Sequence, residues 1–238
     1  MTQVAGGPEI VLLPGLDGTG DLFDRVAQRL AQDLTVTIVR YPQDPMLGYA
    51  GYAELVRKTI GNRNVFLLGE SFSGPVAIIV ATQLKRQVQG VVLAATFVKS
   101  PWPGCILRRA THIDPQKTPS RLRDAILMGP YGDPELVRKV DEIVRTLSRS
   151  VRNARIRAIA EVDVRADFAR LTCPVLVLHG RNDWLVRKSP MQKAVCEKGR
   201  TRMIVLPGAH MLLQTRPAEA AAEIIHFAKS SAEAHYEA

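Results

Sequence analysis

The chain has 238 residues, of which 46% are hydrophobic and 23% charged, and its formal net charge at pH 7 is +9. This balance predicts a globular protein of one domain, or of one domain with a sizeable insertion, and argues against a low-complexity chain. The apolar runs are far shorter than the roughly 20 residues that span a membrane. Residues 1–9 lack the basic start and apolar stretch of a signal peptide, so we expect a cytoplasmic protein without a membrane span.

The composition also restricts the possible ligands. The three cysteines, Cys105, Cys173 and Cys196, form no close pair and no zinc-like spacing with histidine, which argues against a disulfide framework or a metal site. Aromatic residues make up only 5% of the chain, and we find no nucleic-acid-binding motif. Despite the positive charge, we therefore expect no nucleic-acid partner.

Short apolar runs rich in β-branched residues alternate with helical patterns. In chain order we expect a strand at 10–13, a helix at 21–33, a strand at 34–40, a helix at 50–60, a strand at 65–68, a helix at 72–85, a strand at 88–94, a strand at 174–179, a helix at 190–198, a strand at 201–206 and a helix at 217–230. Continuous apolar strands separated by helices predict an α/β fold with a mostly parallel, doubly wound sheet of about six strands. Functional groups in such folds lie at the carboxyl ends of the strands.

The middle segment, residues 99–171, contains no strand-like run and is expected to form two or three helices. The clearest is predicted over 134–158, where one apolar stripe recurs at helical spacing. The stripe consists of Leu136, Val140, Ile143, Leu147, Val151 and Ala154. We expect residues 1–98 and 172–238 to form the core, with 99–171 inserted as a helical cap over the carboxyl edge of the sheet.

Positive charge is concentrated in this middle segment. Residues 99–165 hold 14 Lys and Arg against 8 Asp and Glu. Five of these arginines lie off the apolar stripe: Arg138, Arg145, Arg149, Arg152 and Arg155. They are expected to form either a solvated basic helix face or a docking surface for an acidic partner or substrate.

A candidate nucleophile lies in the sequence Gly-Glu-Ser-Phe-Ser-Gly at 69–74. It follows a predicted strand and begins a predicted helix, as a nucleophile elbow requires, so Ser71 is the expected nucleophile. The usual pattern is G-x-S-x-G, but here Ser73 occupies the fifth position and Gly74 comes one residue later. The alternative is an ordinary Gly/Ser turn between a strand and a helix.

A serine hydroxyl needs a general base, and His210 is the expected one. It follows the predicted strand 201–206 directly, so it should lie at the carboxyl edge of the sheet. The other four histidines fall in the cap, at a strand end, inside the last helix and in the tail: His112, His179, His226 and His235. The alternative for His210 is a loop histidine packed against the last helix.

The base in turn needs a carboxylate that fixes its tautomer, and Asp183 is the expected one. It follows the predicted strand 174–179 on the same edge, 27 residues before His210. Taken alone, it could also be an ordinary turn aspartate. The reaction further needs amide donors for an oxyanion, for which we expect the N–H groups of Phe72 and Leu16. Asp17 and Glu70 are interpreted as loop-stabilising acids.

With these residues in place, the sequence resembles the α/β-hydrolase family over nearly its whole length. The resemblance is carried by LLPGLDGTG at 12–20, GESFSG at 69–74, CPVLVLHGRND at 173–183 and PGAH at 207–210. The order of the expected triad, Ser71, Asp183 and His210, also matches the family. Within the family the chain is similar to small capped carboxylesterases, including esterases that remove a methyl group from a pimeloyl chain on acyl carrier protein.

The resemblance implies a serine carboxylesterase that needs no cofactor and hydrolyses small to medium acyl esters through an acyl-enzyme. An esterase or acyltransferase acting on a carrier-protein-linked substrate, docked on the basic cap, remains the alternative, and a non-catalytic binding protein is a third. The acyl pocket should lie under the cap. Its candidate lining residues, for each of which core or cap packing is the favoured alternative, are Phe97, Trp102, Met128 and Trp184.

Overall fold

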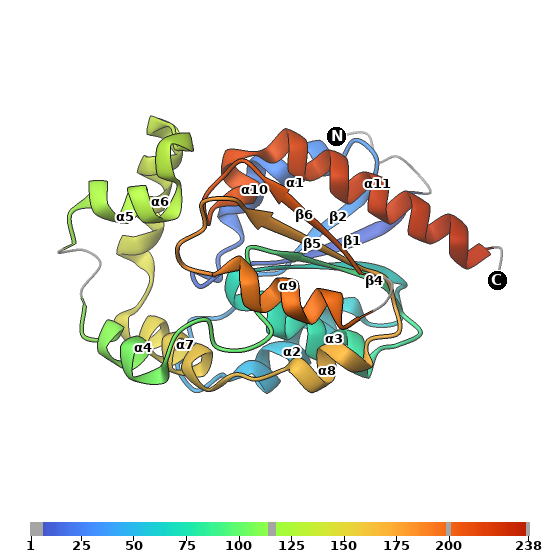
Figure 1. Cartoon of the computed structure of the whole chain (residues 1–238), viewed down its shortest axis with the longest axis horizontal. Coiled ribbons are helices and arrows are strands. Elements are labelled where there is room, and N and C mark those ends of the chain that lie inside the picture. Colours follow the sequence, from blue (N-terminus) through green and yellow to red (C-terminus); the bar gives the residue numbers. More distant parts are fainter. Residues whose placement is uncertain (1–6, 114–117, 199–200, 237–238) are drawn as a thin grey trace.

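The computed structural model describes residues 7–113, 118–198 and 201–236. Its centre is one six-stranded sheet with the order β2-β1-β3-β4-β5-β6, and every strand pair is parallel (Figure 1). The strands are β1 (Glu9–Leu13), β2 (Thr35–Ile38), β3 (Val65–Glu70), β4 (Val88–Ala94), β5 (Val175–Gly180) and β6 (Thr201–Leu206). The predicted α/β fold with about six parallel strands is confirmed.

Helices cover both faces of the sheet, which explains why the strands are apolar along their whole length. One face carries α2 (Tyr49–Ile60), α3 (Gly74–Gln83), α8 (Arg165–Arg170) and α9 (Lys188–Cys196) (Figure 1). The other face carries α1 (Asp24–Leu30), α10 (Leu212–Thr215) and α11 (Pro217–Tyr236), with the short 3-10 helix η1 (Asp21–Phe23) before α1. The arrangement is that of a doubly wound α/β protein.

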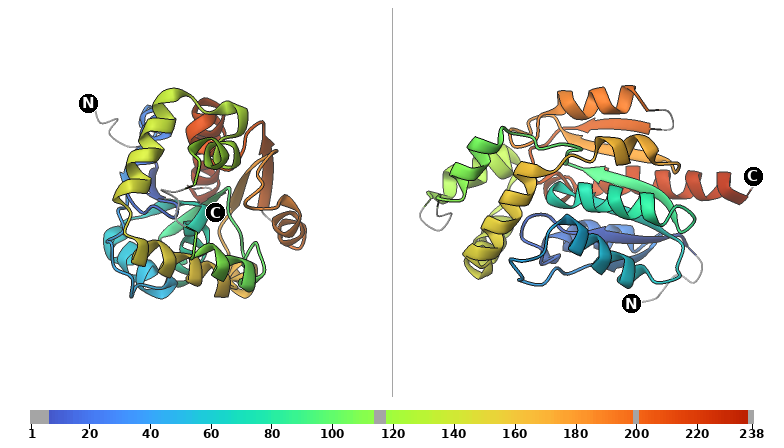
Figure 2. Two further views of the ribbon diagram at one scale, coloured as in Figure 1. Left: turned by 90° about the vertical axis from the view of Figure 1, so that its left-hand side faces the viewer. Right: turned by 90° about the horizontal axis from the view of Figure 1, so that it is seen from below.

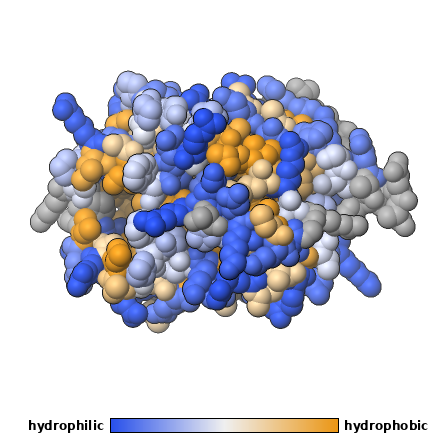
Figure 3. Space-filling view, in the orientation of Figure 1, coloured by the Kyte–Doolittle hydropathy of each residue, from blue (hydrophilic) through white to orange (hydrophobic). Residues whose placement is uncertain are grey.

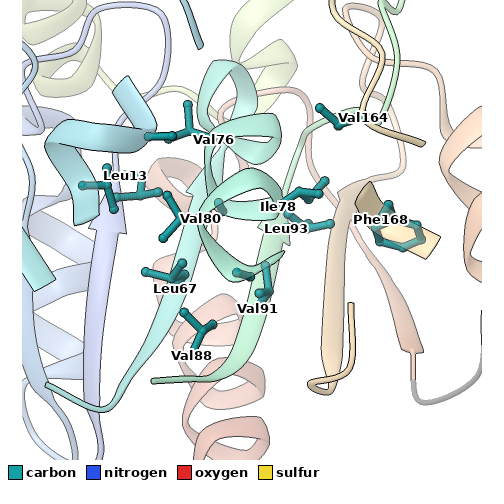
Figure 4. Close-up of a cluster of buried hydrophobic side chains, with 14 of the residues drawn as sticks. Leu13, Leu67, Val76, Ile78, Val80, Val88, Val91, Leu93, Val164 and Phe168 are labelled. Carbon is teal, nitrogen blue, oxygen red and sulfur yellow. The ribbon is translucent and has the colours of Figure 1, made fainter. Parts of the chain in front are cut away.

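Alternate residues of β1, β3, β4 and β5 enter two separate cores. In β1, Val11 and Leu13 belong to the cluster under α2, α3 and α8, whereas Ile10 and Leu12 belong to the cluster under α1 and α11. Figure 4 shows part of the first cluster, where Leu67 and Leu93 of neighbouring strands meet side chains of α3. This two-sided packing fixes the sheet, and with it the edge at which the strands end.

The segment between β4 and β5 is helical in its described part. It contains α4 (Gly104–Ala110), α5 (Ser120–Leu127), the 3-10 helix η3 (Gly129–Tyr131), α6 (Pro134–Thr146), α7 (Arg149–Glu161) and α8. Figures 1 and 2 show α4 to α7 at one end of the sheet, whereas α8 packs against α3. An isolated antiparallel bridge between Lys99 and Asp163 joins the two ends of the α4–α7 excursion. We retain the division into core and cap at residues 99–171 as a proposal.

The prediction of one helix over 134–158 was wrong, because α6 and α7 are separate helices. Leu147 adopts an extended backbone conformation, with φ −71° and ψ 116°, and ends α6. Ser148 then begins α7, and its side chain accepts a hydrogen bond from the amide of Val151. Serine is a preferred residue at a helix start, and this signal overrides the continuous apolar stripe.

On the face shown in Figure 3, hydrophobic side chains form separate patches among hydrophilic ones. Among the described residues, the large hydrophobic side chains that are exposed are Met46, Ile106, Ile113, Leu122 and Trp184. Every helix in the described ranges is too short or too polar to cross a membrane.

Candidate active site

A sharp turn joins β3 to α3 through the 3-10 helix η2 (Ser71–Ser73). Ser71 has φ 49°, in the left-handed region that non-glycine residues rarely adopt. The turn is tight at both ends: a Cβ on Gly69 would lie 2.5 Å from the carbonyl oxygen of Ser73, and one on Gly74 would lie 2.0 Å from Oγ1 of Thr96. The turn therefore has the geometry of a nucleophile elbow, with its second glycine required at position 74.

Ser73, where the usual pattern has glycine, has a different role. Its buried hydroxyl donates a hydrogen bond to the carbonyl of Pro14 and lies 2.8 Å from the hydroxyl of Tyr41. Pro14 begins the loop that follows β1. Ser73, the residue that departs from G-x-S-x-G, thus connects the turn after β3 to the loop after β1. The sequence pattern alone did not suggest this contact.

Ser71, His210 and Asp183 form one hydrogen-bonded chain. The hydroxyl oxygen of Ser71 is 2.9 Å from Nε2 of His210, and Nδ1 of His210 is 2.9 Å from Oδ2 of Asp183. The three residues follow β3, β6 and β5, which end at the same edge of the sheet in parallel register. The structure brings together all three side chains that the sequence analysis selected.

Backbone contacts hold the two partner loops against each other. The amide of Asn182 donates to the carbonyl of Gly208 at 2.9 Å, and a Cβ on Gly180 would lie 2.3 Å from the carbonyl oxygen of Ala209. Oδ1 of Asp183 accepts hydrogen bonds from the amides of Leu185 and Val186, both at 2.9 Å. These bonds fix the carboxylate and leave Oδ2 to face His210.

The electrostatics of the pair favour the charged form of both partners. Burial by itself would lower the pKa of His210, but the charge and hydrogen bond of Asp183, with a smaller contribution from Glu70, outweigh it and raise the pKa above 6.5. Burial would raise the pKa of Asp183, but His210 and the amide of Val186 outweigh it and lower the pKa. An ionised Asp183 can therefore stabilise an imidazolium at His210.

Glu70 is a second buried acid beside Ser71. Burial raises its pKa to about 7, with a further contribution from the charge of Asp17, while a hydrogen bond from Gln214 opposes the shift. Asp17 itself stabilises its loop, since its Oδ1 accepts a hydrogen bond of 2.8 Å from the amide of Thr19. The sequence analysis treated both acids as structural and did not anticipate a carboxyl that titrates near neutrality next to His210.

The loop after β1 presents the Leu16 amide that was predicted as an oxyanion donor. The amide of Gly18 donates to the carbonyl of Gly15 at 3.1 Å and closes the turn. In the part of the chain that the structure describes, the amide of Leu16 has no hydrogen-bond acceptor, and Leu16 lines the cavity beside Ser71. Phe72 follows Ser71 directly, with its ring buried against Tyr49 at a centroid distance of 4.9 Å. Both amides remain candidate donors.

A cavity of about 500 Å³ opens above Ser71 and His210. Its walls are mainly apolar, and α4 to α7 contribute many of them: Leu107, Leu127, Val140, Ile143, Val144, Ile156 and Ile159. Of the predicted lining residues, Phe97 and Trp102 lie in the wall. Met128 is instead buried in a small core with Leu136, and the side chain of Trp184 is 74% exposed.

The sequence analysis placed five arginines on a solvated basic face or a docking surface. Two of them, both on α7, are buried instead. Arg152 is 7% exposed, and Arg155 is wholly buried, with its guanidinium donating to the carbonyl of Leu16 at 2.8 Å. The break before α7 was the missing signal. Because α7 is a separate helix, its buried face does not continue the stripe of α6 and consists of Val151, Arg152, Arg155 and Ile156.

Comparisons with known proteins agree with this geometry. A model of the alpha/beta hydrolase family matches residues 10–224. Similar curated proteins include the pimeloyl-[acyl-carrier protein] methyl ester esterases of Edwardsiella ictaluri, 25% identical over 94% of each chain, and Vibrio parahaemolyticus, 27% identical over 76% of this chain and 78% of the relative.

Solved structures share the fold at low identity. A thermophilic esterase from Thermogutta terrifontis has a TM-score of 0.82 at 17% identity, covering 94% of this chain and 90% of that one. The enol-lactonase from Burkholderia xenovorans has a TM-score of 0.82 at 14% identity, covering 95% of this chain and 93% of that one. The family model spans most of the sequence, and the sheet has six parallel strands, as predicted. The chain belongs to the α/β-hydrolase family.

Proposed function

We propose that the protein is a cytoplasmic serine carboxylesterase that hydrolyses small to medium acyl esters without a cofactor. The observation that carries the proposal is the chain of two 2.9 Å contacts from Ser71 through His210 to Asp183, at the floor of an apolar cavity. A binding protein would not need a strained serine, a histidine and a carboxylate in this order. The proposal assigns them as nucleophile, general base and orienting acid.

In the proposed cycle, His210 accepts the proton of Ser71 while the serine oxygen attacks the ester carbonyl. The amides of Leu16 and Phe72 donate to the oxyanion that forms. Collapse of the intermediate expels the alcohol, which receives the proton from His210. Water then attacks the acyl-enzyme with His210 again as base, and the carboxylic acid leaves.

The size and lining of the cavity support an acyl group of small to medium length. About 500 Å³ lies within the range of sites for small molecules. Apolar side chains of α4 to α7 surround it, and burying a hydrocarbon chain among them would contribute about 0.8 kcal/mol per methylene. We assign the acyl chain to this space, under the proposed cap.

A second candidate is an esterase or acyltransferase for a substrate carried by an acidic acyl carrier protein. The names of the curated relatives favour it, as does the charge of residues 99–165. Several arginines of this segment are exposed: Arg108, Arg109, Arg121, Arg138 and Arg145. Positive side chains around a cavity would attract an acidic carrier.

Hydrolysis of p-nitrophenyl acetate, butyrate and octanoate by the wild type and by Ser71→Ala tests the first candidate. The variant should lose activity by several orders of magnitude, because removal of the nucleophile disables a triad as a unit (about 10⁶-fold in subtilisin). Turnover that survives in Ser71→Ala would contradict the proposal.

The second candidate is tested with a pimeloyl methyl ester on its carrier protein and with the same ester as a free small molecule. The double variant Arg108→Glu, Arg109→Glu should lower kcat/KM for the carrier-linked ester alone. Lys58→Glu on α2, whose side chain is 77% exposed, is the matched control. Equal rates for the two substrates in all proteins would exclude carrier docking at this surface.

A further inference from the structure

Arg155 extends from α7 into the sheet domain, where no part of its side chain is exposed. Its guanidinium donates three hydrogen bonds to groups outside the 99–171 segment. Nε donates to the hydroxyl of Tyr52 at 2.9 Å, Nη1 to the carbonyl of Leu16 at 2.8 Å, and Nη2 to the carbonyl of Pro42 at 3.1 Å. One side chain of the middle segment thus joins three separate parts of the core.

The environment of this charge is unusual because none of the ion pairs in the described ranges involves Arg155. Instead, the guanidinium carbon lies 5.8 Å from the ring centroid of Tyr41, 5.3 Å from that of Tyr52 and 6.0 Å from that of Phe72. Carbonyl oxygens and ring faces can stabilise a buried cation, but burying a charge without a carboxylate is costly. Because burying this charge is costly, we infer that the contacts of the guanidinium have a function.

The contact with Leu16 bears directly on the oxyanion loop. Three successive carbonyls of this loop are held by donors: that of Pro14 by the hydroxyl of Ser73, that of Gly15 by the amide of Gly18, and that of Leu16 by Arg155. Peptide units are planar and trans, so a held carbonyl also fixes the amide on the opposite side of its plane. The plane before Leu16 contains the held carbonyl of Gly15 and the amide of Leu16, and the plane after it contains the carbonyl that Arg155 holds. With both planes held, Leu16 cannot rotate its amide, which has no acceptor among the described residues.

The loop is also shaped to admit the guanidinium. Gly18 has φ +75°, and a Cβ there would lie 2.5 Å from Nη1 of Arg155. Glycine is therefore required at this position both for the backbone conformation and for the approach of the arginine. The fit between Gly18 and Arg155 indicates a built contact rather than a chance orientation of a long side chain.

We propose that Arg155 is a positioning residue for the oxyanion hole, acting through the carbonyl of Leu16 on the orientation of the Leu16 amide. The inference rests on the proposed function, since it needs Ser71 to generate an oxyanion. Helix α7 also supplies Ile156 and Ile159 to the cavity wall. The acyl pocket and the oxyanion loop therefore share one support, and a displacement of α7 would disturb both.

The test compares Arg155→Met, which keeps an unbranched side chain as far as the position of Nε but has no donors, with Arg155→Lys and with the control Arg157→Met. Arg157 lies on the same helix and is exposed. Three quantities are measured: kcat and KM for a p-nitrophenyl ester, the inhibition constant of an alkyl trifluoromethyl ketone, and that of the carboxylic acid product. The hydroxyl of Ser71 adds to the ketone carbon, its proton passes to His210, and the carbonyl electron pair becomes an oxyanion that needs the hole.

Arg155→Met should lower kcat by about 10²-fold, the loss associated with one oxyanion donor, with KM changed less than about 3-fold. The inhibition constant of the ketone should rise by a similar factor, while that of the product acid, which has no tetrahedral oxyanion, stays unchanged. Arg155→Lys should show a smaller loss of the same pattern, because a lysine retains the charge but lacks the planar fork of donors. Arg157→Met should match the wild type.

A kcat within about 3-fold of the wild type in Arg155→Met would overturn the inference, as would an equal loss of affinity for ketone and product, which indicates a structural role alone. If Arg155→Met does not fold, Arg155→Lys decides by the same comparison of ketone and product. A wild-type protein that forms no ketone adduct would overturn the proposed function and this inference together. A wild-type adduct with unchanged Arg155 variants would overturn only the inference.

Discussion

The side-chain amide of Gln214 donates a hydrogen bond of 2.8 Å to a carboxyl oxygen of Glu70, the residue that precedes Ser71. Both side chains are buried, and burial raises the pKa of Glu70 to about 7. The ionised carboxylate in turn raises the pKa of His210. The site therefore contains, besides Asp183, an acid whose charge changes near neutral pH and acts on the proposed base.

Glu70→Gln should move the acid limb of kcat/KM to lower pH. The neutral side chain no longer stabilises the imidazolium, so the pKa of His210 falls and the neutral base persists at lower pH. The limb should follow a single ionisation, because the coupled acid is gone. Rate profiles from pH 5 to 9 measure it, with the half-exposed Glu54→Gln on α2 as control. An unchanged limb, or one moved to higher pH, would argue against the coupling.

Asp183→Asn should reduce kcat by about 10³- to 10⁴-fold with little change in KM, because the amide no longer fixes the tautomer of His210 or stabilises its charge. The substitution leaves an oxygen for the amides of Leu185 and Val186, so the loop should keep its shape. The residual pH profile should also move to lower pH, since Asp183 raises the pKa of His210. Steady-state kinetics measure both effects, and a loss below 10-fold would remove Asp183 from the triad.

Ser73→Ala should destabilise the fold by about 1–3 kcal/mol, because it leaves the carbonyl of Pro14 and the hydroxyl of Tyr41 without their buried partner. Urea unfolding measures the loss. Tyr41→Phe in the same background should add less than it costs alone, since the two side chains share one network. Fully additive costs would show that the hydroxyls are not coupled.

Asp133 joins the start of α6 to α1. Its carboxylate accepts from the amide of Leu136 at 2.9 Å and pairs with Arg25, which lowers the pKa of Asp133 to about 2. Asp133→Ala should cost about 1 kcal/mol as a lost helix cap, whereas Asp133→Asn, which can still cap, should lose only the small contribution of an exposed ion pair. Equal losses in the two variants would contradict this separation.

The pH dependence of the Asp133 contribution follows from the sign of its shift. Folding lowers its pKa from 3.8 to about 2, so the stabilisation is complete above pH 4 and disappears as the pH falls towards 2. The difference in unfolding free energy between wild type and Asp133→Asn should shrink over this interval. A difference that stays constant down to pH 2 would assign the effect to something other than the ion pair.

Sequence patterns predicted the sheet well, because its order of strands and helices depends on signals that lie within short stretches of chain. The apolar run of β3 and the glycines at 69 and 74 are such signals, and they also predicted the elbow at Ser71. His210 and Asp183 could be selected because parallel strands end at one edge, so residues that follow different strands meet.

Contacts between the middle segment and the core could not be predicted in this way. Arg155 meets Leu16 from a position 139 residues away, and the contact depends on where α7 starts. A continuous helix from 134 placed this arginine outside the apolar stripe, whereas the separate helix α7 has a buried face of its own that includes Arg155. The pKa of Glu70 likewise depends on burial by distant residues such as Gln214, of which the local sequence gives no sign.

The most direct test of the account is the site of modification by a fluorophosphonate probe. The wild-type protein should react in a 1:1 ratio and lose ester hydrolysis in parallel, and peptide mass spectrometry should locate the phosphonyl group on Ser71. His210→Ala should react far more slowly, because the serine loses its base. Modification at another residue, or a Ser71→Ala variant that still reacts and hydrolyses esters at the wild-type rate, would contradict the assignment of Ser71 as the nucleophile.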